Sequence, residues 1–273
     1  MQEIKLIVSD IDNTLVHALS KEPTRENLEA VKRVQDRGIR FTLATGRALA
    51  TTRRFIKLFG VKMPVITCNG AEIANQEETF YSERFPKRLV LRIMDMLSDM
   101  NVRHFLYSGR KVYCLKGDMD ERLREAWKGG GMHSGDLVYL ETREEIADAA
   151  AGNTQKILGW ADSDEMHKEL LSMQSQFAEV DVVNTLGMNA EFIRKDVNKG
   201  SALKWLCELY DIPSDCVLAL GDAGNDVEML QFAGVGVAVS NGQPEAAAAA
   251  DHIVDNSNGT GVAEAIGRFV LNV

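Results

Sequence analysis

The stretch IKLIVSDIDNT, residues 4–14, joins an apolar run to a polar cluster that contains two aspartates. An apolar run of this length predicts a strand that is buried on both faces of a sheet. Asp10 and Asp12 then fall at the carboxyl end of the strand, where open parallel sheets place their ligand sites. Because residues two apart in an extended segment project from the same face, the two carboxylates are predicted to lie side by side.

Outward from this stretch, strand patterns alternate with helical spacing of apolar residues over about the first 80 and the last 80 residues. The strands predicted in these two segments cover residues 4–8, 39–44, 65–68, 217–220 and 235–239. Alternation of strand and helix predicts a parallel sheet with right-handed crossovers and helices on both faces. The expected fold class is therefore α/β, with a core built on a Rossmann-like, doubly wound parallel sheet.

The middle of the chain has a different pattern. Its clearest predicted elements are a helix and the two strands of a hairpin, at residues 86–100, 102–107 and 111–115. A glycine run at residues 129–131 matches neither a P-loop nor a dinucleotide fingerprint, and it predicts a loop. We therefore expect an α+β domain inserted into the core: residues 1–83 and 189–273 form the core, and residues 84–188 form the inserted domain.

The composition is that of a soluble enzyme, with 45% hydrophobic and 26% charged residues among 273. A formal charge of −9 argues against non-specific binding to nucleic acid or to anionic membranes, which needs clustered Lys and Arg. No signal peptide and no membrane-spanning run is predicted. The four cysteines are widely spaced and form no CxxC pair, which favours a reduced, cytoplasmic protein. The pattern gives no indication of the oligomeric state.

A second acidic cluster, GDAGND at residues 221–226, also follows an apolar strand. In a parallel sheet its carboxylates can meet Asp10 and Asp12 at one edge. Converging carboxylates repel each other unless a cation is present, and an all-oxygen ligand set favours Mg²⁺ over zinc. Thr14 and Leu15 occupy positions where a calcium-binding EF-hand loop requires other residues. Taken alone, the second cluster is equally well explained as an ordinary Asp-Gly turn.

Two more polar residues stand at the ends of predicted elements. Thr45 follows the second strand, where a hydroxyl and backbone N–H groups at a strand-to-helix junction suit an anionic oxygen. Lys199 opens a late helix, directly after Asn198. Taken alone, Thr45 indicates only a helix N-cap, and a single lysine in that position indicates only a solvated side chain.

Together and in this order, the motifs resemble the haloacid dehalogenase-like superfamily: DxDxT after the first strand, Thr after the second, Lys at a late helix and GDxxND after the next strand. More narrowly, four segments are similar to the Cof-type branch, namely ATGR (44–47), NGA (69–71), NKG (198–200) and GDAGND (221–226). That branch inserts its cap domain between the third core strand and the lysine, which agrees with the inserted domain expected here.

The resemblance implies a role for each matched residue. Asp10 would attack phosphorus and become phosphorylated, and Asp12 would protonate the leaving oxygen and then activate water. Mg²⁺ would be held by the carboxylates of Asp10 and Asp222 and the backbone carbonyl of Asp12, with Asp226 supporting these ligands. The residues implied to bind the phosphoryl oxygens are Thr45, Gly46, Lys199 and Asn225.

One position departs from the pattern, since Asn13 stands where Cof-type proteins usually have Gly. Asn tolerates left-handed backbone geometry better than most residues, so we expect little consequence.

The expected activity is Mg²⁺-dependent hydrolysis of a small phosphorylated metabolite, such as a sugar phosphate, with a substrate choice set by the inserted domain. Two alternatives differ in chemistry. A phosphomutase resembling the eukaryotic phosphomannomutases would depend on a bisphosphate activator. A non-catalytic sugar-phosphate sensor would be expected to lack the nucleophile or the acid, whereas Asp10 and Asp12 are both present.

Overall fold

The described residues of the computed structural model are 3–16, 22–121, 124–125, 132–184 and 187–271. The chain divides into two compact units, each of which draws on more than one segment. The first unit consists of Met1–Thr45, Phe55–Phe80 and Asn198–Val273, and the second of Gly46–Arg54 and Tyr81–Val197. The predicted glycine loop at 129–131 lies outside the described residues. Among those described, no helix is both long and apolar enough to cross a membrane.

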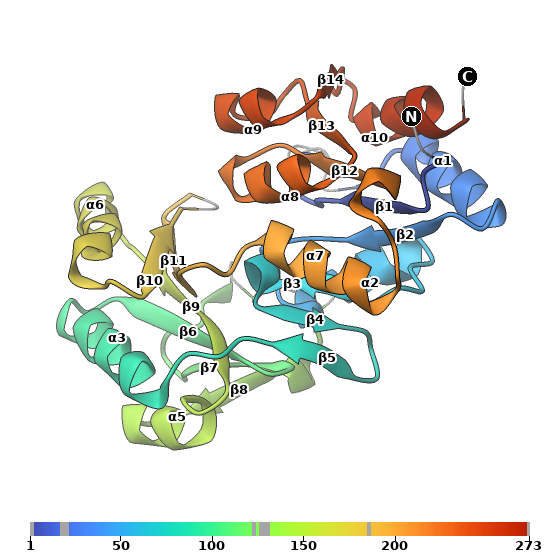
Figure 1. Ribbon diagram of the computed structural model, residues 1–273. Coiled ribbons are helices and arrows are strands. Elements are labelled where there is room, and N and C mark those ends of the chain that lie inside the picture. Colours follow the sequence, from blue (N-terminus) through green and yellow to red (C-terminus); the bar gives the residue numbers. More distant parts are fainter. Residues whose placement is uncertain (1–2, 17–21, 122–123, 126–131, 185–186, 272–273) are drawn as a thin grey trace. The chain divides into compact units, whose positions relative to one another are not determined.

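The first unit is built on a five-stranded sheet with the strand order β14-β13-β12-β1-β2, in which all the pairs are parallel (Figure 1). The strands are β1 (Leu6–Ser9), β2 (Arg40–Leu43), β12 (Val217–Gly221), β13 (Val235–Val239) and β14 (His252–Val254). Every residue of β1, β12 and β13 is buried. These strands read as unbroken apolar runs because both faces of the sheet are covered.

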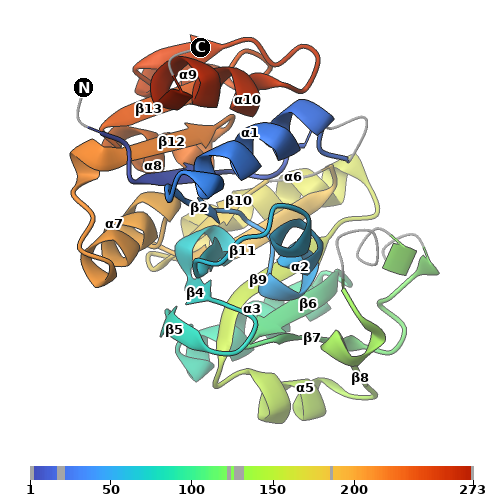
Figure 2. The same cartoon turned by 90° about the vertical axis from the view of Figure 1, so that its right-hand side faces the viewer.

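Helices cover the two faces of this sheet (Figures 1 and 2). Helix α1 packs beside α10, and α8 packs beside both α7 and α9. The helices are α1 (Arg25–Asp36), α7 (Lys199–Leu209), α8 (Val227–Phe232), α9 (Pro244–Ala249) and α10 (Gly261–Ile266). Short 3₁₀ turns and a final π turn complete the unit, at η1 (Cys68–Gly70), η4 (Ser214–Cys216), η5 (Gly224–Asp226) and η6 (Gly267–Leu271). The predicted α/β class with a doubly wound parallel sheet is confirmed.

The third predicted strand does not extend the parallel sheet. Residues Val65–Thr67 form β3, which pairs in antiparallel fashion with β4 (Glu72–Ala74) in a separate three-stranded sheet completed by β5 (Thr79–Ser82). A single parallel bridge, Ala44 to Ile66, aligns β3 with the residue after β2, and the Thr45 N–H donates to the Ile66 carbonyl. Cys68, Asn69 and Gly70 have φ values of 51°, 56° and 101°. This run of left-handed residues reverses the chain directly after β3, so the parallel alignment with β2 stops at one bridge and β4 returns antiparallel to β3.

The second unit contains a six-stranded mixed sheet with the order β10-β11-β9-β6-β7-β8. Its strands are β6 (Arg103–Ser108), β7 (Lys111–Leu115), β8 (Leu137–Leu140), β9 (Thr154–Trp160), β10 (Val180–Val183) and β11 (Asn189–Arg194). The predicted hairpin is confirmed, since β6 and β7 pair in antiparallel register. Among the described residues of this unit, the helices and 3₁₀ turns that accompany the sheet include α3 (Lys87–Asp99), α5 (Arg143–Ala150), α6 (Asp164–Ser172), η2 (Ser134–Asp136) and η3 (Met173–Gln176).

The second unit extends further along the chain than the expected inserted domain, 84–188. Strand β11 was expected to belong to the core, but it pairs with β9 and β10 in antiparallel ladders. The return to the first unit therefore falls at Val197 and Asn198. The segment Gly46–Arg54, which contains the first turns of α2 (Leu49–Leu58), also groups with the second unit.

The second unit has its own apolar core, in which Leu97, Leu106, Ile157 and Phe192 are completely buried. The rings of Phe177 and Phe192 form a T-shaped pair, with 6.4 Å between ring centroids. Replacing Phe192 with Ala should lower the free energy of unfolding by about 3–5 kcal/mol, because an aromatic ring is lost and a cavity remains.

Urea unfolding followed by circular dichroism measures this loss. The matched control is Tyr139→Ala in the same unit, because Tyr139 is 39% exposed and its removal should cost about 1 kcal/mol or less. Equal losses in the two variants would contradict the assignment of the core.

Candidate active site

The first acidic pair lies where β1 ends. The backbone N–H of Asp10 donates to the Leu220 carbonyl at 2.9 Å, which extends the pairing of β1 with β12 by one residue. Asp10 is buried, whereas Asp12 is exposed in the turn that follows. Asn13 has a φ of 63°, so the left-handed geometry expected at this position is present. The turn therefore holds one carboxylate inside and presents the other to solvent.

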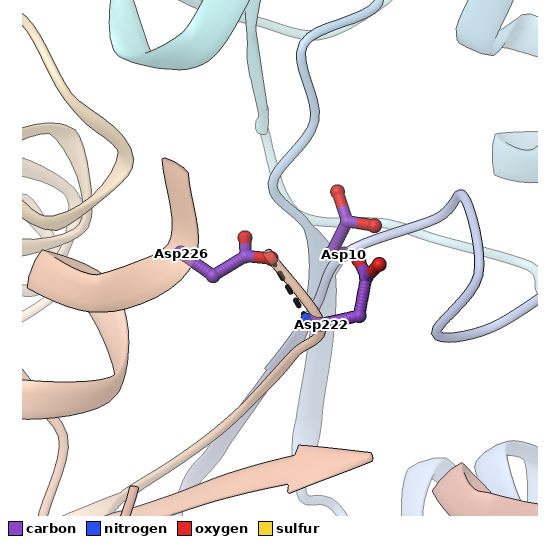
Figure 3. A group of neighbouring side chains, drawn as sticks. All are labelled: Asp10, Asp222 and Asp226. Atoms are coloured by element: carbon purple, nitrogen blue, oxygen red, sulfur yellow. Dashed lines mark hydrogen bonds between the residues drawn. The ribbon is translucent and has the colours of Figure 1, made fainter. Parts of the chain in front are cut away.

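The second acidic cluster begins where the neighbouring strand β12 ends. The Asp226 Oδ2 atom accepts hydrogen bonds from the backbone N–H groups of Asp222, at 2.9 Å, and Ala223, at 3.1 Å (Figure 3). A Cβ atom at Gly221 would lie 2.5 Å from the Asp226 side chain, so glycine is needed for this approach. Asp226 thereby holds the backbone of the loop in a tight turn and fixes the position of the Asp222 backbone, which carries the carboxylate.

Lys199 is the first residue of α7 and is completely buried. Its Nζ atom donates to Asp10 Oδ1 and to Asp226 Oδ1, in both cases at 2.6 Å. Asn198 caps the helix by accepting from the Ser201 N–H at 2.7 Å. A Cβ atom at Gly70 would lie 2.2 Å from the Asn198 carbonyl oxygen, so η1 can pack there only with glycine. The lysine that the sequence alone presents as solvated is thus the centre of a buried ion-pair network.

The carboxylate oxygens of Asp10, Asp222 and Asp226 lie within 4.8 Å of one another (Figure 3). Burial raises the pKa of Asp10 well above its usual range; the nearby Lys199 ammonium opposes this, and the neighbouring aspartates add to it. Burial and Asp226 raise the pKa of Asp222 to about 6. Burial lowers the pKa of Lys199, but Asp10 and Asp226 outweigh it and hold that pKa above its ordinary value. The site therefore carries more buried negative charge than its one ammonium neutralises.

A hard divalent cation fits this arrangement. The donors are all oxygen atoms, which Mg²⁺ prefers, and a cation would relieve the repulsion that raises the Asp10 and Asp222 pKa values. Asp226 has both oxygens occupied, one by Lys199 and the other by backbone N–H groups. Asp10 and Asp222 are therefore the side chains suited to hold the ion, and Asp226 is suited to support them.

The remaining predicted residues lie in different places. Thr45 follows β2 and is buried; its N–H donates to the Ile66 carbonyl at 2.9 Å. Asn225 is half-buried, and its Nδ2 donates to Asn69 Oδ1 at 3.0 Å. Gly46 groups with the second unit, where its carbonyl accepts from Lys156 Nζ at 2.7 Å. The structure therefore brings Asp10, Lys199, Asp222 and Asp226 into direct contact, and it places Thr45 at the end of the strand beside β1.

Two groups shape the site that were not among the predicted catalytic, metal-binding or phosphate-binding residues. Thr14 donates its hydroxyl to Asp222 Oδ1 at 3.3 Å, and so joins the two acidic loops. Asn69 orients the Asn225 amide. The sequence marks each residue only as part of a motif. A single Thr or Asn in a turn usually forms a hydrogen bond with the neighbouring backbone, so neither residue type by itself indicates a site.

A family model described as haloacid dehalogenase-like hydrolase matches residues 7–266. The chain belongs to this family. The match covers both acidic clusters, Lys199 and the whole second unit, so the resemblance expected from the motifs is confirmed.

Named relatives match over almost their entire lengths. The chain is 27% identical to the 5-amino-6-(5-phospho-D-ribitylamino)uracil phosphatase YcsE of Bacillus subtilis, covering 98% of this chain and 97% of the relative. It is 29% identical to a phosphoglycolate phosphatase of Methanosarcina acetivorans, covering 97% and 96%. Among solved structures, a haloacid dehalogenase-like hydrolase of Bacteroides thetaiotaomicron superposes with a TM-score of 0.83 at 27% identity, covering 97% and 99%. The expected enzyme class, a haloacid dehalogenase-like phosphatase, is confirmed.

The raised pKa of Asp222 generates a prediction about metal binding. A pKa of about 6 means that the folded, metal-free protein keeps a proton on Asp222 below that pH, so protons compete with a divalent cation there. Saturating Mg²⁺ should raise the melting temperature by several degrees at about pH 7.5, and by clearly less at about pH 5.5.

Differential scanning fluorimetry with Mg²⁺ against EDTA measures the shift. NaCl at matched ionic strength is the control for general screening. A shift that is independent of pH, or that NaCl reproduces, would count against a metal site at Asp222.

Proposed function

We propose that this protein is a Mg²⁺-dependent phosphomonoester hydrolase that acts on a small phosphorylated metabolite through an aspartyl phosphate on Asp10. The observation that carries the proposal is the buried contact of Lys199 with Asp10 and Asp226, at the ends of two neighbouring parallel strands. The lysine fixes one Asp10 oxygen, which restricts the rotation of the carboxylate and aims it for attack. Phosphoryl transfer depends mainly on such positioning and on charge neutralisation.

The first step forms a bond between an Asp10 oxygen and phosphorus and breaks the bond from phosphorus to the leaving oxygen. Asp12 supplies the proton that the leaving oxygen needs. Asp12 suits this task because it lies two residues after the nucleophile and is exposed, so it can reach a substrate that Asp10 attacks. The products are the free alcohol and a phosphorylated Asp10.

The second step hydrolyses the aspartyl phosphate. Asp12, now ionised, takes a proton from water, whose oxygen attacks phosphorus while the bond from phosphorus to the Asp10 oxygen breaks. Inorganic phosphate leaves, and Asp12 holds the proton for the next turnover. A carboxylate that donates in one step and accepts in the next is restored without any other group.

The charge of the phosphoryl group requires cationic and donor groups beside Asp10. We propose that Thr45, Gly46, Lys199 and Asn225 bind its oxygens, and that Asp10, Asp222 and the Asp12 carbonyl hold Mg²⁺. When bound, the ion neutralises charge on the phosphoryl oxygens. Asp226 would keep Lys199 and the Asp222 backbone in place.

We propose that the second unit acts as a cap that determines substrate choice. The relatives named above act on a ribitylaminouracil phosphate and on phosphoglycolate, which supports a small phosphate monoester as the substrate class here. A reducing, cytoplasmic location is also proposed; the four cysteines are buried thiols.

A panel of phosphate monoesters tests the function, with phosphoglycolate, sugar phosphates, pyridoxal phosphate and flavin-type phosphates as members. The protein should release inorganic phosphate with Mg²⁺ and not with EDTA, and Asp10→Asn should lower kcat by about 10³-fold or more, because the nucleophile is lost. Asp36→Asn is the matched control, because Asp36 is exposed at the end of α1 and has no proposed role; its kcat should stay at the wild-type value. Phosphate release that survives in Asp10→Asn would contradict the mechanism, and activity only with a bisphosphate activator would favour a mutase.

The role of Asp12 predicts a dependence on the leaving group. In Asp12→Asn, the rate of phosphoryl transfer from an alkyl phosphate to Asp10 should fall almost to zero, because the leaving alkoxide receives no proton. p-Nitrophenyl phosphate needs no such proton, so rapid mixing should still show a burst of about one nitrophenol per enzyme before slow turnover. Equal losses of the first step for the two esters would show that Asp12 is not the acid.

A further inference from the structure

A completely buried asparagine lies against the turn that carries Asp12. Asn256 belongs to the loop between β14 and α10 and has no exposed surface. Its Nδ2 donates to the Asn13 carbonyl at 2.9 Å and to Asn241 Oδ1 at 2.9 Å, and the Thr14 carbonyl lies at 3.5 Å. Its Oδ1 accepts from the Gly261 N–H at 2.8 Å. The side chain is thus surrounded by partners on both ends of its amide.

These partners allow only one orientation of the amide. Three oxygen atoms face Nδ2 and one N–H faces Oδ1, so a reversed amide would place like groups together. Asn256 in turn orients Asn241, because Asn241 Oδ1 accepts from it while Asn241 Nδ2 donates to the Asn13 carbonyl at 2.9 Å. Two amides therefore converge on one carbonyl oxygen, that of the residue directly after Asp12.

The segment that contains Asn241 also contacts the second acidic loop. The Gln243 N–H donates to the Asp222 carbonyl at 2.6 Å, and Gln243 Oε1 accepts from the Gly224 N–H at 3.1 Å. Residues 241–243 thus bridge the turn after Asp12 and the loop that begins at Asp222. Asn256 donates to this bridge at Asn241 Oδ1 and to the Asn13 carbonyl that Asn241 also contacts.

We infer that Asn256 is a positioning residue, whose amide fixes the turn carrying Asp12 relative to Asp222. Asn13 has left-handed geometry, and its carbonyl accepts hydrogen bonds from the side-chain amides of Asn241 and Asn256. The inference rests on the proposed function, in which the Asp12 carboxylate moves protons and the Asp12 carbonyl holds Mg²⁺. Small displacements of such groups, on the order of 1 Å, lower rates by about 10²-fold.

The chain contains a matched control for this residue. Asn27, in α1, is also completely buried. Its Nδ2 donates to the carbonyls of Leu15, at 3.1 Å, and Gly259, at 2.9 Å, and its Oδ1 accepts from the Ala263 N–H at 2.9 Å. Asn27 therefore has the same side chain and burial as Asn256. It contacts the carbonyl of Leu15, three residues after Asp12, and not that of Asn13.

The experiment compares Asn256→Asp with Asn27→Asp. Each replacement keeps the shape of the side chain and its acceptor for a backbone N–H, while it removes the donors to two oxygen atoms. The melting temperature should fall by a similar number of degrees in the two variants. Asn256→Asp alone should lower kcat by about 10–100-fold with KM within about threefold of wild type, and should weaken Mg²⁺ binding about tenfold by calorimetry. In Asn27→Asp, kcat and the Mg²⁺ affinity should stay within about threefold of the wild-type values.

Two results would overturn the inference. One is that both variants lose stability and keep the wild-type kcat and Mg²⁺ affinity; the other is that both lose kcat to the same degree, which would show a general packing effect. If Asn256→Asp does not fold, Asn241→Ala removes an exposed donor to the same carbonyl and should lower kcat about three- to tenfold. A wild-type kcat in Asn241→Ala would also overturn the inference.

The same measurements separate this inference from the proposed function. If wild-type protein releases no phosphate from any ester, the proposed function fails. The calorimetric comparison of Mg²⁺ affinity in Asn256→Asp and Asn27→Asp still decides whether Asn256 positions the Asp12 turn.

Discussion

The buried ammonium of Lys199, held between Asp10 and Asp226, is the interaction on which the rest of the site depends. A desolvated lysine persists only if its partners are close and well aligned, because removing one partner leaves an uncompensated buried charge. The two contacts at 2.6 Å meet this condition. They require that α7 begin directly beside the ends of β1 and β12, and the close approaches at Gly70 and Gly221 make that possible.

Much of this arrangement could be predicted from the sequence, because its strongest signals are local. Apolar runs that end in acidic residues located both clusters, and the parallel order of the strands placed them at one edge. The burial of Lys199 was not a local signal, since a lone lysine at a helix start looks solvated; only its place in an ordered set of motifs identified it. The structure shows where these residues lie, and the roles in turnover of all of them stay predictions, from the nucleophile Asp10 to the phosphate-binding Asn225.

Other features escaped prediction for physical reasons. The reversal after β3 begins with left-handed geometry at Cys68, a residue that gives no turn signal, before the Asn69-Gly70 pair that does. Strand β11 carries a pattern that suits either sheet, and only its pairing with β9 and β10 assigns it. Asn256 contacts the Asn13 and Thr14 carbonyls, which lie more than 200 positions away in the sequence, and no periodic pattern predicts such a contact.

The order of strands in the parallel sheet has a consequence for biosynthesis. Strand β1 is flanked by β2 on one side and by β12 on the other, and both segments of the second unit are encoded between those neighbours. At about 5–20 residues per second, a ribosome needs roughly 10–35 seconds to travel from β2 to β12. During that interval the nascent chain carries an apolar strand with one unpaired edge, which is the kind of surface that chaperones bind.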